Sequence, residues 1–204
     1  GPDIALLLLA KGADPNTCDH FGESILSRAA SQGDARLIEA LLDKGAVFDS
    51  TRRHPIMEAA YSGSAKVIAV LVKADKELDL EKGDHEGLTP LLVAARHGRL
   101  AAMQALKGAG ARPDAHDKAG RTALHHTAIS GKLDCLQEAL AWGLDKDELD
   151  RAGWSPLCHA AANNRPELIK QLAALGASLE SKTRAEGWTP LLVAANQNHS
   201  ESVN

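Results

Sequence analysis

Nine histidines and three cysteines are the side chains of this sequence best suited to metal binding or nucleophilic catalysis. His125 and Cys158 are 33 residues apart, and so are His126 and His159. A cysteine beside a histidine is the combination that activates a thiolate nucleophile, and a set of three such side chains is typical of zinc sites. The sequence therefore raises two hypotheses, a Cys158–His159 nucleophile and a metal site formed by His126, Cys158 and His159.

The spacing of these residues argues against both hypotheses. Consecutive residues of a helix point about 100° apart, so the imidazole of His159 does not face the Cys158 thiol. Side chains one repeat apart start roughly 8–10 Å from each other, whereas zinc ligands lie about 2.0–2.3 Å from the ion. There is no glycine-rich phosphate loop, and the adjacent acids Asp147 and Glu148 fall in a solvated loop. We predict no catalytic residue, no metal ligand and no cofactor.

Composition narrows the class of protein further. The formal net charge is -4 with both signs spread along the chain, which argues against nucleic acid as a partner. Residues are 44% hydrophobic but only 3% aromatic, so the core must consist of Ala, Leu, Ile and Val, which favours closely packed helices. The longest apolar run, Ile4 to Ala10, is closed by Lys11 and is too short to insert into a membrane.

The cysteines also indicate a compartment. Cys18, Cys135 and Cys158 are odd in number and far apart, so neither a disulfide framework nor a paired metal motif follows from them. A reducing compartment fits best, and we expect the protein in the cytoplasm, with the nucleus as the alternative. We expect no signal peptide, and we leave Gly1 and Pro2 out of the fold reasoning as an expression remnant.

The elements that must position these residues recur along the chain. Six segments of similar sequence align, with starts 30, 35, 33, 33 and 34 residues apart. They are GESILSRAASQG (22–33), RRHPIMEAAYSG (52–63), GLTPLLVAARHG (87–98), GRTALHHTAISG (120–131), GWSPLCHAAANN (153–164) and GWTPLLVAANQN (187–198). Such a period indicates a stack of supersecondary units in place of a single globular core.

Each segment has the signature of a short helix. Five of the six begin with a turn glycine and a hydroxyl residue suited to cap a helix, and four of the six have proline at the first helical position. The caps are Ser24, Thr89, Thr122, Ser155 and Thr189, and the prolines are Pro55, Pro90, Pro156 and Pro190. The helices end at Gly or Asn, which tolerate a left-handed backbone. These ends are Gly33, Gly63, Gly98, Gly131, Asn164 and Asn198.

A second helix follows in each repeat, with apolar residues at helical spacing such as Leu37, Ile38, Leu41 and Leu42. It ends at Gly45, Gly110, Gly143 or Gly176, and a hairpin-like loop leads to the next repeat. We therefore predict an all-α array of helix–turn–helix units. Its expected bounds are a partial repeat at 1–18, full repeats at 19–50, 51–83, 84–116, 117–149 and 150–183, and a truncated repeat at 184–204.

These segments closely resemble the ankyrin repeat, and the resemblance covers essentially the whole chain. It implies an L-shaped solenoid whose first helices and protruding loops form a concave inner surface, and a role in protein recognition. His125 occupies the histidine position of the family's TPLH motif, where the imidazole makes structural hydrogen bonds between loops. Neither end of the sequence reads as a polar capping repeat, so we expect this array to be part of a longer one.

The second full repeat departs from the family pattern. Its entering loop is short, with Arg52 in place of glycine and His54 in the cap position, and Asp75 replaces the glycine that ends its second helix. Loop-length drift explains this, because surface loops tolerate changes of length. The alternative is a shortened loop that shapes the binding face. Asn16 resembles the loop asparagine that hydroxylases modify in this family, although a turn-stabilising role is the simpler interpretation.

The resemblance also places a partner-binding surface. Positions that vary between repeats within this chain fall on the expected concave face and loop tips. One is the position after the TPLH histidine, which reads Arg28, Glu58, Val93, His126, His159 and Val193, and whose divergence we interpret as surface freedom. From the central and C-terminal repeats we predict these partner-binding residues: Arg96, His97, Arg121, Trp154, Asn163, Trp188 and Asn196.

The two tryptophans in this set have two interpretations. Large aromatics are enriched at interface hot spots, but each indole can instead pack on the neighbouring loop as local core. The expected partner is a protein, bound through an acidic and apolar segment, and the array is expected to be a monomer. The alternative is a regulatory or targeting segment of a larger enzyme, channel or secreted microbial effector.

Overall fold

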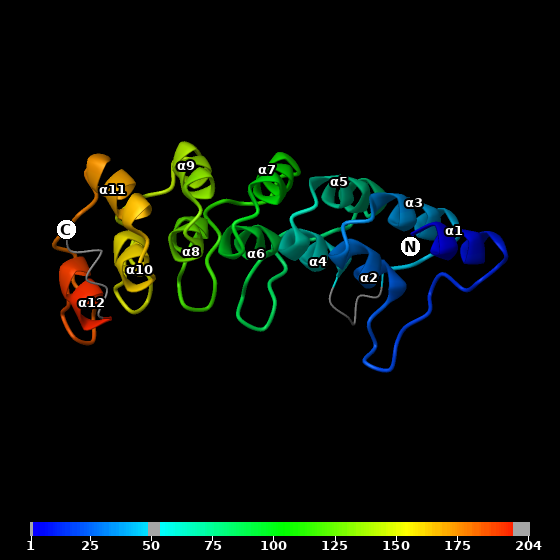
Figure 1. The fold of residues 1–204 in the computed structure, drawn as a ribbon, viewed down its shortest axis with the longest axis horizontal. Helices are drawn as coiled ribbons and strands as arrows, with labels where there is room; N and C mark the ends of the chain where they lie inside the picture. The colour runs from blue at the N-terminus through cyan, green and yellow to red at the C-terminus, as the bar shows by residue number, and fades with distance from the viewer. Residues whose placement is uncertain (1, 49–53, 198–204) are drawn as a thin grey trace.

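The computed structural model describes residues 2–48 and 54–197 of the chain. These residues contain twelve helices and no strand, apart from a single bridge between Cys18 and Ser24. Ten of the helices form five successive pairs, one further helix lies at each end, and all stack side by side in one elongated array (Figure 1). The predicted all-α repeat solenoid is confirmed.

The helices form two rows. Those that follow a hairpin-like loop form the inner row: α2 (Ile25–Ser31), α4 (Pro55–Ser62), α6 (Pro90–Arg96), α8 (Ala123–Ser130), α10 (Pro156–Ala162) and α12 (Pro190–Asn196). The outer row is α1 (Pro2–Ala10), α3 (Ala35–Asp43), α5 (Ala65–Ala74), α7 (Leu100–Gly108), α9 (Leu133–Ala141) and α11 (Pro166–Ala174). Figure 1 shows the long loops projecting from the inner row, away from the outer helices.

Local chemistry sets where the inner helices begin. The hydroxyls of Ser24, Thr89, Ser155 and Thr189 each accept a hydrogen bond from a backbone N–H of the first turn, as predicted. His54 takes the same place before α4, because its Nδ1 accepts from the backbone N–H of Ile56 at 3.1 Å. The shortened loop that contains Arg52 lies outside the described residues.

Left-handed residues set where the helices end. Gly63 and Gly131 have φ of +88° and +80°, and Asn164 has φ of +52°, the one positive value at a residue other than glycine among the described residues. The predicted alternation of Gly and Asn at helix ends is confirmed, and Asn198 lies outside the described residues. Asp75, which replaces glycine after α5, keeps an ordinary φ of −107°.

Small and apolar side chains join the repeats. Alanine pairs such as Ala94 and Ala95 are fully buried in the inner row, where they let neighbouring helices approach closely. Leucines and isoleucines of the outer row, including Ile38, Leu71 and Leu106, are fully buried between the two rows. One continuous apolar core therefore runs through most of the array.

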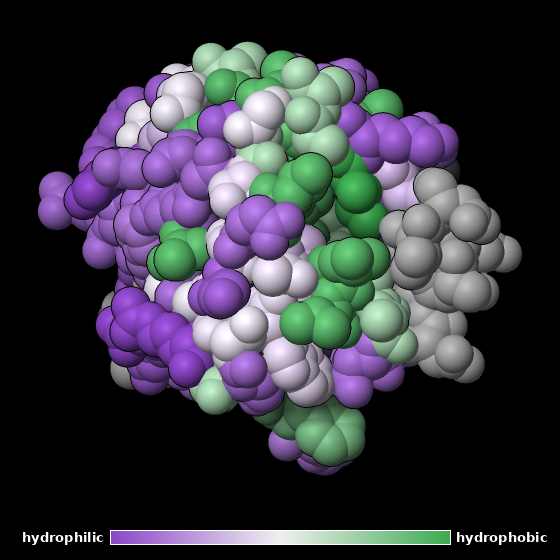
Figure 2. Space-filling view, turned by 90° about the vertical axis from the view of Figure 1, so that its left-hand side faces the viewer, coloured by the Kyte–Doolittle hydropathy of each residue, from purple (hydrophilic) through white to green (hydrophobic). Residues whose placement is uncertain are grey.

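The core is exposed at the end of the stack. Leu191 and Leu192 of α12 are 59% and 51% exposed, whereas Leu91 and Leu92, at the same places in α6, are 0% exposed. Figure 2 shows apolar side chains gathered on this C-terminal end of the molecule. The same positions are thus buried wherever another two-helix unit stacks on them.

Candidate functional site

The loops that precede the inner helices share one internal support. We call them fingers and define them as residues 17–24, 84–89, 117–122, 150–155 and 183–189. In the fourth, Oδ1 of Asp150 accepts hydrogen bonds from the backbone N–H groups of Ala152 and Trp154, both at 2.9 Å. Asp19, Asp84 and Asp117 do the same in their fingers, and the Thr183 hydroxyl replaces the carboxylate in the last.

Backbone hydrogen bonds link neighbouring fingers. The N–H of Lys118 donates to the carbonyl of Glu86 at 2.9 Å, and the N–H of Arg151 donates to the carbonyl of Ala119 at 2.9 Å. The N–H of Arg184 continues the series to the carbonyl of Ala152 at 2.8 Å. Four fingers therefore form one hydrogen-bonded row, and their tips are held in fixed positions before any partner arrives.

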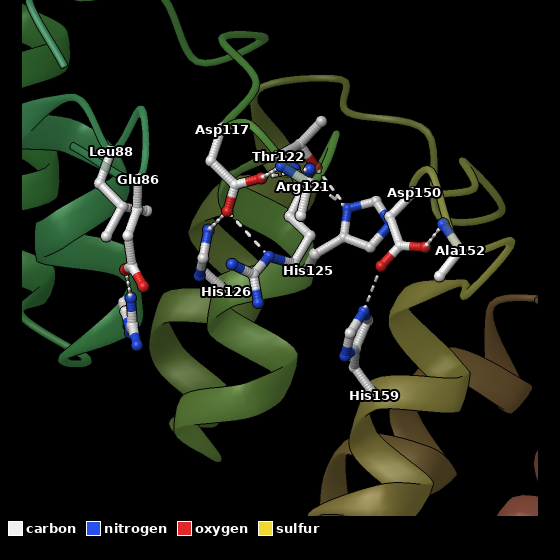
Figure 3. Close-up of polar contacts among 12 residues, drawn as sticks. Glu86, Leu88, Asp117, Arg121, Thr122, His125, His126, Asp150, Ala152 and His159 are labelled. Carbon is white, nitrogen blue, oxygen red and sulfur yellow. Dashed lines mark hydrogen bonds and ion pairs between the residues drawn. The ribbon is translucent and has the colours of Figure 1, made fainter. Parts of the chain in front are cut away.

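Asp117 connects its finger to the inner helix behind it. Its Oδ2 accepts from Nε2 of His126 at 3.0 Å and from Nε of Arg121 at 2.8 Å, and both Asp117 and His126 are fully buried at their side chains (Figure 3). Burial alone raises the pKa of the Asp117 carboxyl, but the hydrogen bonds from His126 and Arg121 outweigh burial and hold the pKa well below its usual range. The carboxylate is thus a charged structural anchor.

The same arrangement recurs one repeat later. Nε2 of His159 donates to Oδ2 of Asp150 at 2.9 Å, and burial of the Asp150 carboxyl is again outweighed by that hydrogen bond, which lowers its pKa (Figure 3). Burial lowers the pKa of His126 although Asp117 opposes the shift, so this imidazole is neutral at pH 7. His126 and His159 therefore each donate a hydrogen bond to the aspartate nine residues before them.

His125 holds two repeats together, as the resemblance implied. Its Nδ1 accepts from the Thr122 backbone N–H at 3.2 Å and lies 2.9 Å from the Thr122 hydroxyl. With Nδ1 as acceptor, Nε2 carries the proton and donates to the carbonyls of Glu148 at 3.0 Å and Trp154 at 3.2 Å. Burial, followed by the charge of His159, lowers the pKa of His125 to about 4.

The interpretation of the position after His125 as a free surface position is wrong for half of the repeats. Val93, His126 and Val193 are 3%, 0% and 1% exposed. Arg28 is exposed, and His159 is half-buried. The fingers fold back over the start of the inner helices and cover this position. It is therefore occupied by an apolar side chain or by a histidine that pairs with the finger aspartate.

The predicted cationic residues Arg96 and Arg121 are both paired with an acid. Arg96 forms an ion pair with Glu86 of the adjacent finger, and its side chain is 39% exposed. Arg121 is held by Asp117, and its side chain is 24% exposed. Both guanidinium groups therefore have restricted motion while part of each remains accessible.

Three of the predicted residues end inner helices. His97 is exposed, and its ring meets the ring of Tyr61 edge-on with centroids 4.4 Å apart. Burial, and then the charges of Arg96 and Arg99, lower the pKa of His97, so it is neutral at pH 7. Asn163 and Asn196 are exposed at the ends of α10 and α12.

The two predicted tryptophans come together at the C-terminal end. Trp154 and Trp188 are half-buried, and both pack against a small apolar cluster formed by Ala161, Val193 and Ala194. The Trp154 ring also lies beside the His159 ring, with centroids 5.2 Å apart. Each indole thus supports its finger with one part and presents another part to solvent.

The hypotheses of metal binding and nucleophilic catalysis find no matching geometry in the described residues. His126 and His159 turn to different aspartates, and no group of three His, Cys, Asp or Glu side chains in this part of the chain is placed to hold a metal ion. Cys135 and Cys158 are buried, and burial raises the pKa of the Cys135 thiol to about 12. A thiol in that state is a poor nucleophile at pH 7.

The finger aspartates are the residues that sequence reasoning missed. Asp117 and Asp150 precede His126 and His159 by nine residues in two consecutive repeats. That repeated spacing was the available signal, because it brings a carboxylate and an imidazole together once the finger folds back on the helix.

Comparison with known proteins identifies the same repeat. A family model described as ankyrin repeats (3 copies) matches residues 1–82, 73–150, 91–183 and 128–204, which together cover the chain. The human ankyrin repeat domain-containing protein 63 is 34% identical over 118 residues, which is 52% of this chain and 31% of that protein. No helix in the described residues is long and apolar enough to cross a membrane.

Two further relatives are a ubiquitin ligase and a Notch protein. E3 ubiquitin-protein ligase KEG of Arabidopsis thaliana is 31% identical over 124 residues, which is 59% of this chain and 7% of the ligase. The neurogenic locus Notch protein of Drosophila melanogaster is 38% identical over 93 residues, or 44% of this chain and 3% of that protein. The similarity to all three relatives thus spans less than a third of their own length.

Proposed function

Because the chain belongs to the ankyrin-repeat family, we propose that it is a protein–protein interaction module that binds a partner through its concave face and finger tips. The observation that carries the proposal is the row of hydrogen-bonded fingers. Fixed fingers lower the entropy that a surface loses on binding, so they favour recognition of a partner. The proposed contact residues are Arg96, His97, Arg121, Trp154, Asn163, Trp188 and Asn196.

A non-enzymatic role in the cytoplasm, or alternatively in the nucleus, completes this proposal. Asp117, Asp150, His125, His126 and His159 are buried or partly buried acid–base groups at the fingers and inner helices of the central repeats. Each makes structural hydrogen bonds that a catalytic cycle would have to break. We propose a monomeric module that uses no metal or cofactor and whose ligand is a segment of another protein.

The test replaces one of the proposed anchors. Truncating a central aromatic typically costs about 2 kcal/mol or more, so Trp154→Ala should weaken partner binding by roughly thirtyfold. The partner is first captured from a lysate of the source organism and identified by mass spectrometry. Its dissociation constant for purified wild-type and variant protein is then measured by titration calorimetry.

The control is Lys170→Ala on outer helix α11, where the lysine is exposed and paired only with Glu167. We expect this variant to bind the partner as the wild type does. Thermal unfolding separates binding from folding, because Trp154 also supports its finger. If Trp154→Ala unfolds the array and no variant weakens binding without unfolding, the assignment of this residue to the interface is wrong.

A second function has its own support. The similarity covers 31% of the human relative and 7% of the ligase, so in those proteins the similar segment is one part of a longer chain. This observation fits a regulatory or targeting segment within a larger enzyme, channel or secreted microbial effector. The sequence of the whole gene separates the two functions, because a catalytic or membrane domain elsewhere in it favours the second.

A further inference from the structure

A first row of cations follows the finger tips. Lys118, Arg151 and Arg184 each stand one residue after the Asp or Thr that supports their finger, and all three are exposed. Their backbone N–H groups make the hydrogen bonds between fingers described above. The base of each side chain lies across the glycine of the preceding finger, so that a methyl group at Gly120 would come within 2.9 Å of Arg151 Cγ.

A second row stands at the opposite end of the inner helices. Arg99, Lys132 and Arg165 come just after the left-handed residues that end α6, α8 and α10. Nε of Arg99 donates to the Tyr61 carbonyl at 3.0 Å, and Nε of Arg165 donates to the Ile129 carbonyl at 3.3 Å. These carbonyls are at helix C-termini, where the helix dipole favours a positive charge.

Neither row is paired with an acid among the residues that the structure describes. Within the described part of the chain, no carboxylate lies within 4.0 Å of a charged nitrogen of any of the six side chains. The neighbouring acids Glu86 and Asp117 are already paired with Arg96 and with Arg121. Helices α6, α8, α10 and α12 contain no Asp or Glu at all.

The surface between the rows is wide enough for an extended peptide. We call it the inner strip and define it as the surface of α6, α8 and α10 between the two rows, where the partly exposed residues are Arg96, Ile129, Ser130, His159 and Ala162. A helix of seven or eight residues is about 11 Å long at a rise of about 1.5 Å per residue. An extended chain lies about 5 Å from each neighbour in a sheet, so one chain fits between the rows.

We propose that the inner strip binds an acidic segment of a partner protein in an extended conformation. This inference rests on the proposed function and names the chemistry of the partner. Neighbouring repeats are stacked roughly 8–10 Å apart, and an extended chain advances about 3.3 Å per residue. An Asp or Glu at every third position of the segment therefore places one carboxylate at each repeat, directed alternately at the first and at the second row, because positions three apart in an extended chain point to opposite sides.

The charge distribution favours a protein segment over nucleic acid. The whole chain carries a formal net charge of -4, so a long polyanion is repelled by the rest of the molecule. Asp145, Asp147 and Glu148 lie in the loop between α9 and the finger that begins at Asp150, outside the inner strip. A long polyanion that extends past the inner strip would meet such carboxylates, whereas a short acidic segment need not.

The experiment measures the affinity for defined peptides by fluorescence anisotropy. The probe is a labelled peptide of repeated Glu-Ser-Ala units, and its matched control has Gln in place of every Glu. We expect the protein to bind the Glu peptide and not the Gln peptide. Raising the salt concentration from about 0.05 M to about 0.3 M should weaken binding severalfold, because exposed charges are screened.

The variant combines Lys118→Gln, Arg151→Gln and Arg184→Gln, which remove the finger row. We expect roughly tenfold weaker binding, since each exposed charge pair contributes modestly. The matched control combines Lys66→Gln, Lys73→Gln and Lys107→Gln on outer helices α5 and α7, which removes the same charge from exposed sites. It should retain nearly wild-type affinity. Lys132→Gln alone, which should weaken binding about twofold, serves as the second variant if the triple variant does not fold.

Three outcomes overturn the inference: equal binding of both peptides, equal effects of the two triple variants, or tighter binding of a duplex oligonucleotide that the finger-row variant abolishes. The captured partner separates this inference from the proposed function. If Trp154→Ala weakens partner binding but the finger-row variant does not, the acidic-segment inference fails and protein recognition stands. If neither variant affects the partner, both fail.

Discussion

Three histidines of two adjacent repeats show how one residue type can take different structural roles. His125 joins the backbone of one repeat to that of the next, while His126 and His159 each donate to a finger aspartate. Of the three, His125 needs an uncharged ring, because its Nδ1 accepts from the Thr122 backbone N–H. Protonation of His125 in acid therefore weakens the joint between two repeats.

His125 makes a prediction about pH. Its pKa is about 4 in the folded protein and 6.5 when unperturbed. Between these values the unfolded chain binds a proton that the folded chain does not, so stability is complete above pH 6.5 and falls as the pH drops toward 4. The shift corresponds to a loss on the order of 3 kcal/mol. Urea unfolding at a series of pH values measures it.

His125→Leu is the matching variant, because Leu92 occupies the same place in α6 and is fully buried. We expect a lower stability at pH 7, where the hydrogen bonds of His125 are lost, but a shallower decline of stability with acid. A decline as steep as that of the wild type would mean that His125 is not the group responsible.

Single residues were predictable where a family motif or a helix-cap pattern specifies their role. The role of His125 followed from its motif, and the cap function of His54 followed from its place before Pro55. The burial of His126 did not, because it depends on a finger that folds back to bring Asp117 over the helix. For Trp154, partial burial leaves both interpretations of its indole in agreement with the structure.

The finger is the element on which we propose that a partner is recognised. The tip of a finger needs a residue with a left-handed backbone, and the next finger packs directly on that residue. Gly120 has φ of +79°, and Arg151 Cγ and N would lie 2.9 Å and 3.1 Å from an added methyl group. Glycine is therefore required twice at this position, for its backbone and for its lack of a side chain.

Gly120→Ala should destabilise the array by about 2–3 kcal/mol, from about 1 kcal/mol of backbone strain plus the overlap with Arg151. Gly143→Ala is the matched control, since Gly143 has φ of +84° but nothing within 4 Å of the added methyl. Gly143→Ala should lower the free energy of unfolding by the backbone strain alone. Urea unfolding measures both variants, and equal losses would show that the packing of Arg151 on the finger contributes nothing.

Helices and their ends were predictable for a physical reason. A cap, a first-turn proline and a terminal glycine act within a few residues, so the sequence of each repeat specifies its own boundaries. The links between fingers are different, because the bond from Lys118 to Glu86 joins residues that no local pattern relates. The same holds for the cation rows, which become rows only after stacking.

At the scale of the molecule, contacts connect only neighbours. The extensive contacts join helices of one repeat or of adjacent repeats: α2 meets α4, α4 meets α6, and α3 meets α5. Stability is then a sum of repeat terms and interface terms, and a local defect loosens the nearest units first. This organisation also explains why the ends expose apolar surface, as Leu8 of α1 and Leu191 of α12 do.

Two core substitutions near opposite ends test that organisation. Leu41 of α3 and Leu172 of α11 are both fully buried, and replacing either with serine should cost about 3 kcal/mol or more. Native-state hydrogen exchange reads the loss of protection helix by helix. Leu172→Ser should speed exchange in α9 to α12 while α2 to α5 remain protected, and Leu41→Ser should give the reverse pattern. Each variant is the control for the other. If both variants instead lower protection equally in all helices, the array unfolds as one cooperative unit, and nearest-neighbour contacts do not limit how far a defect spreads.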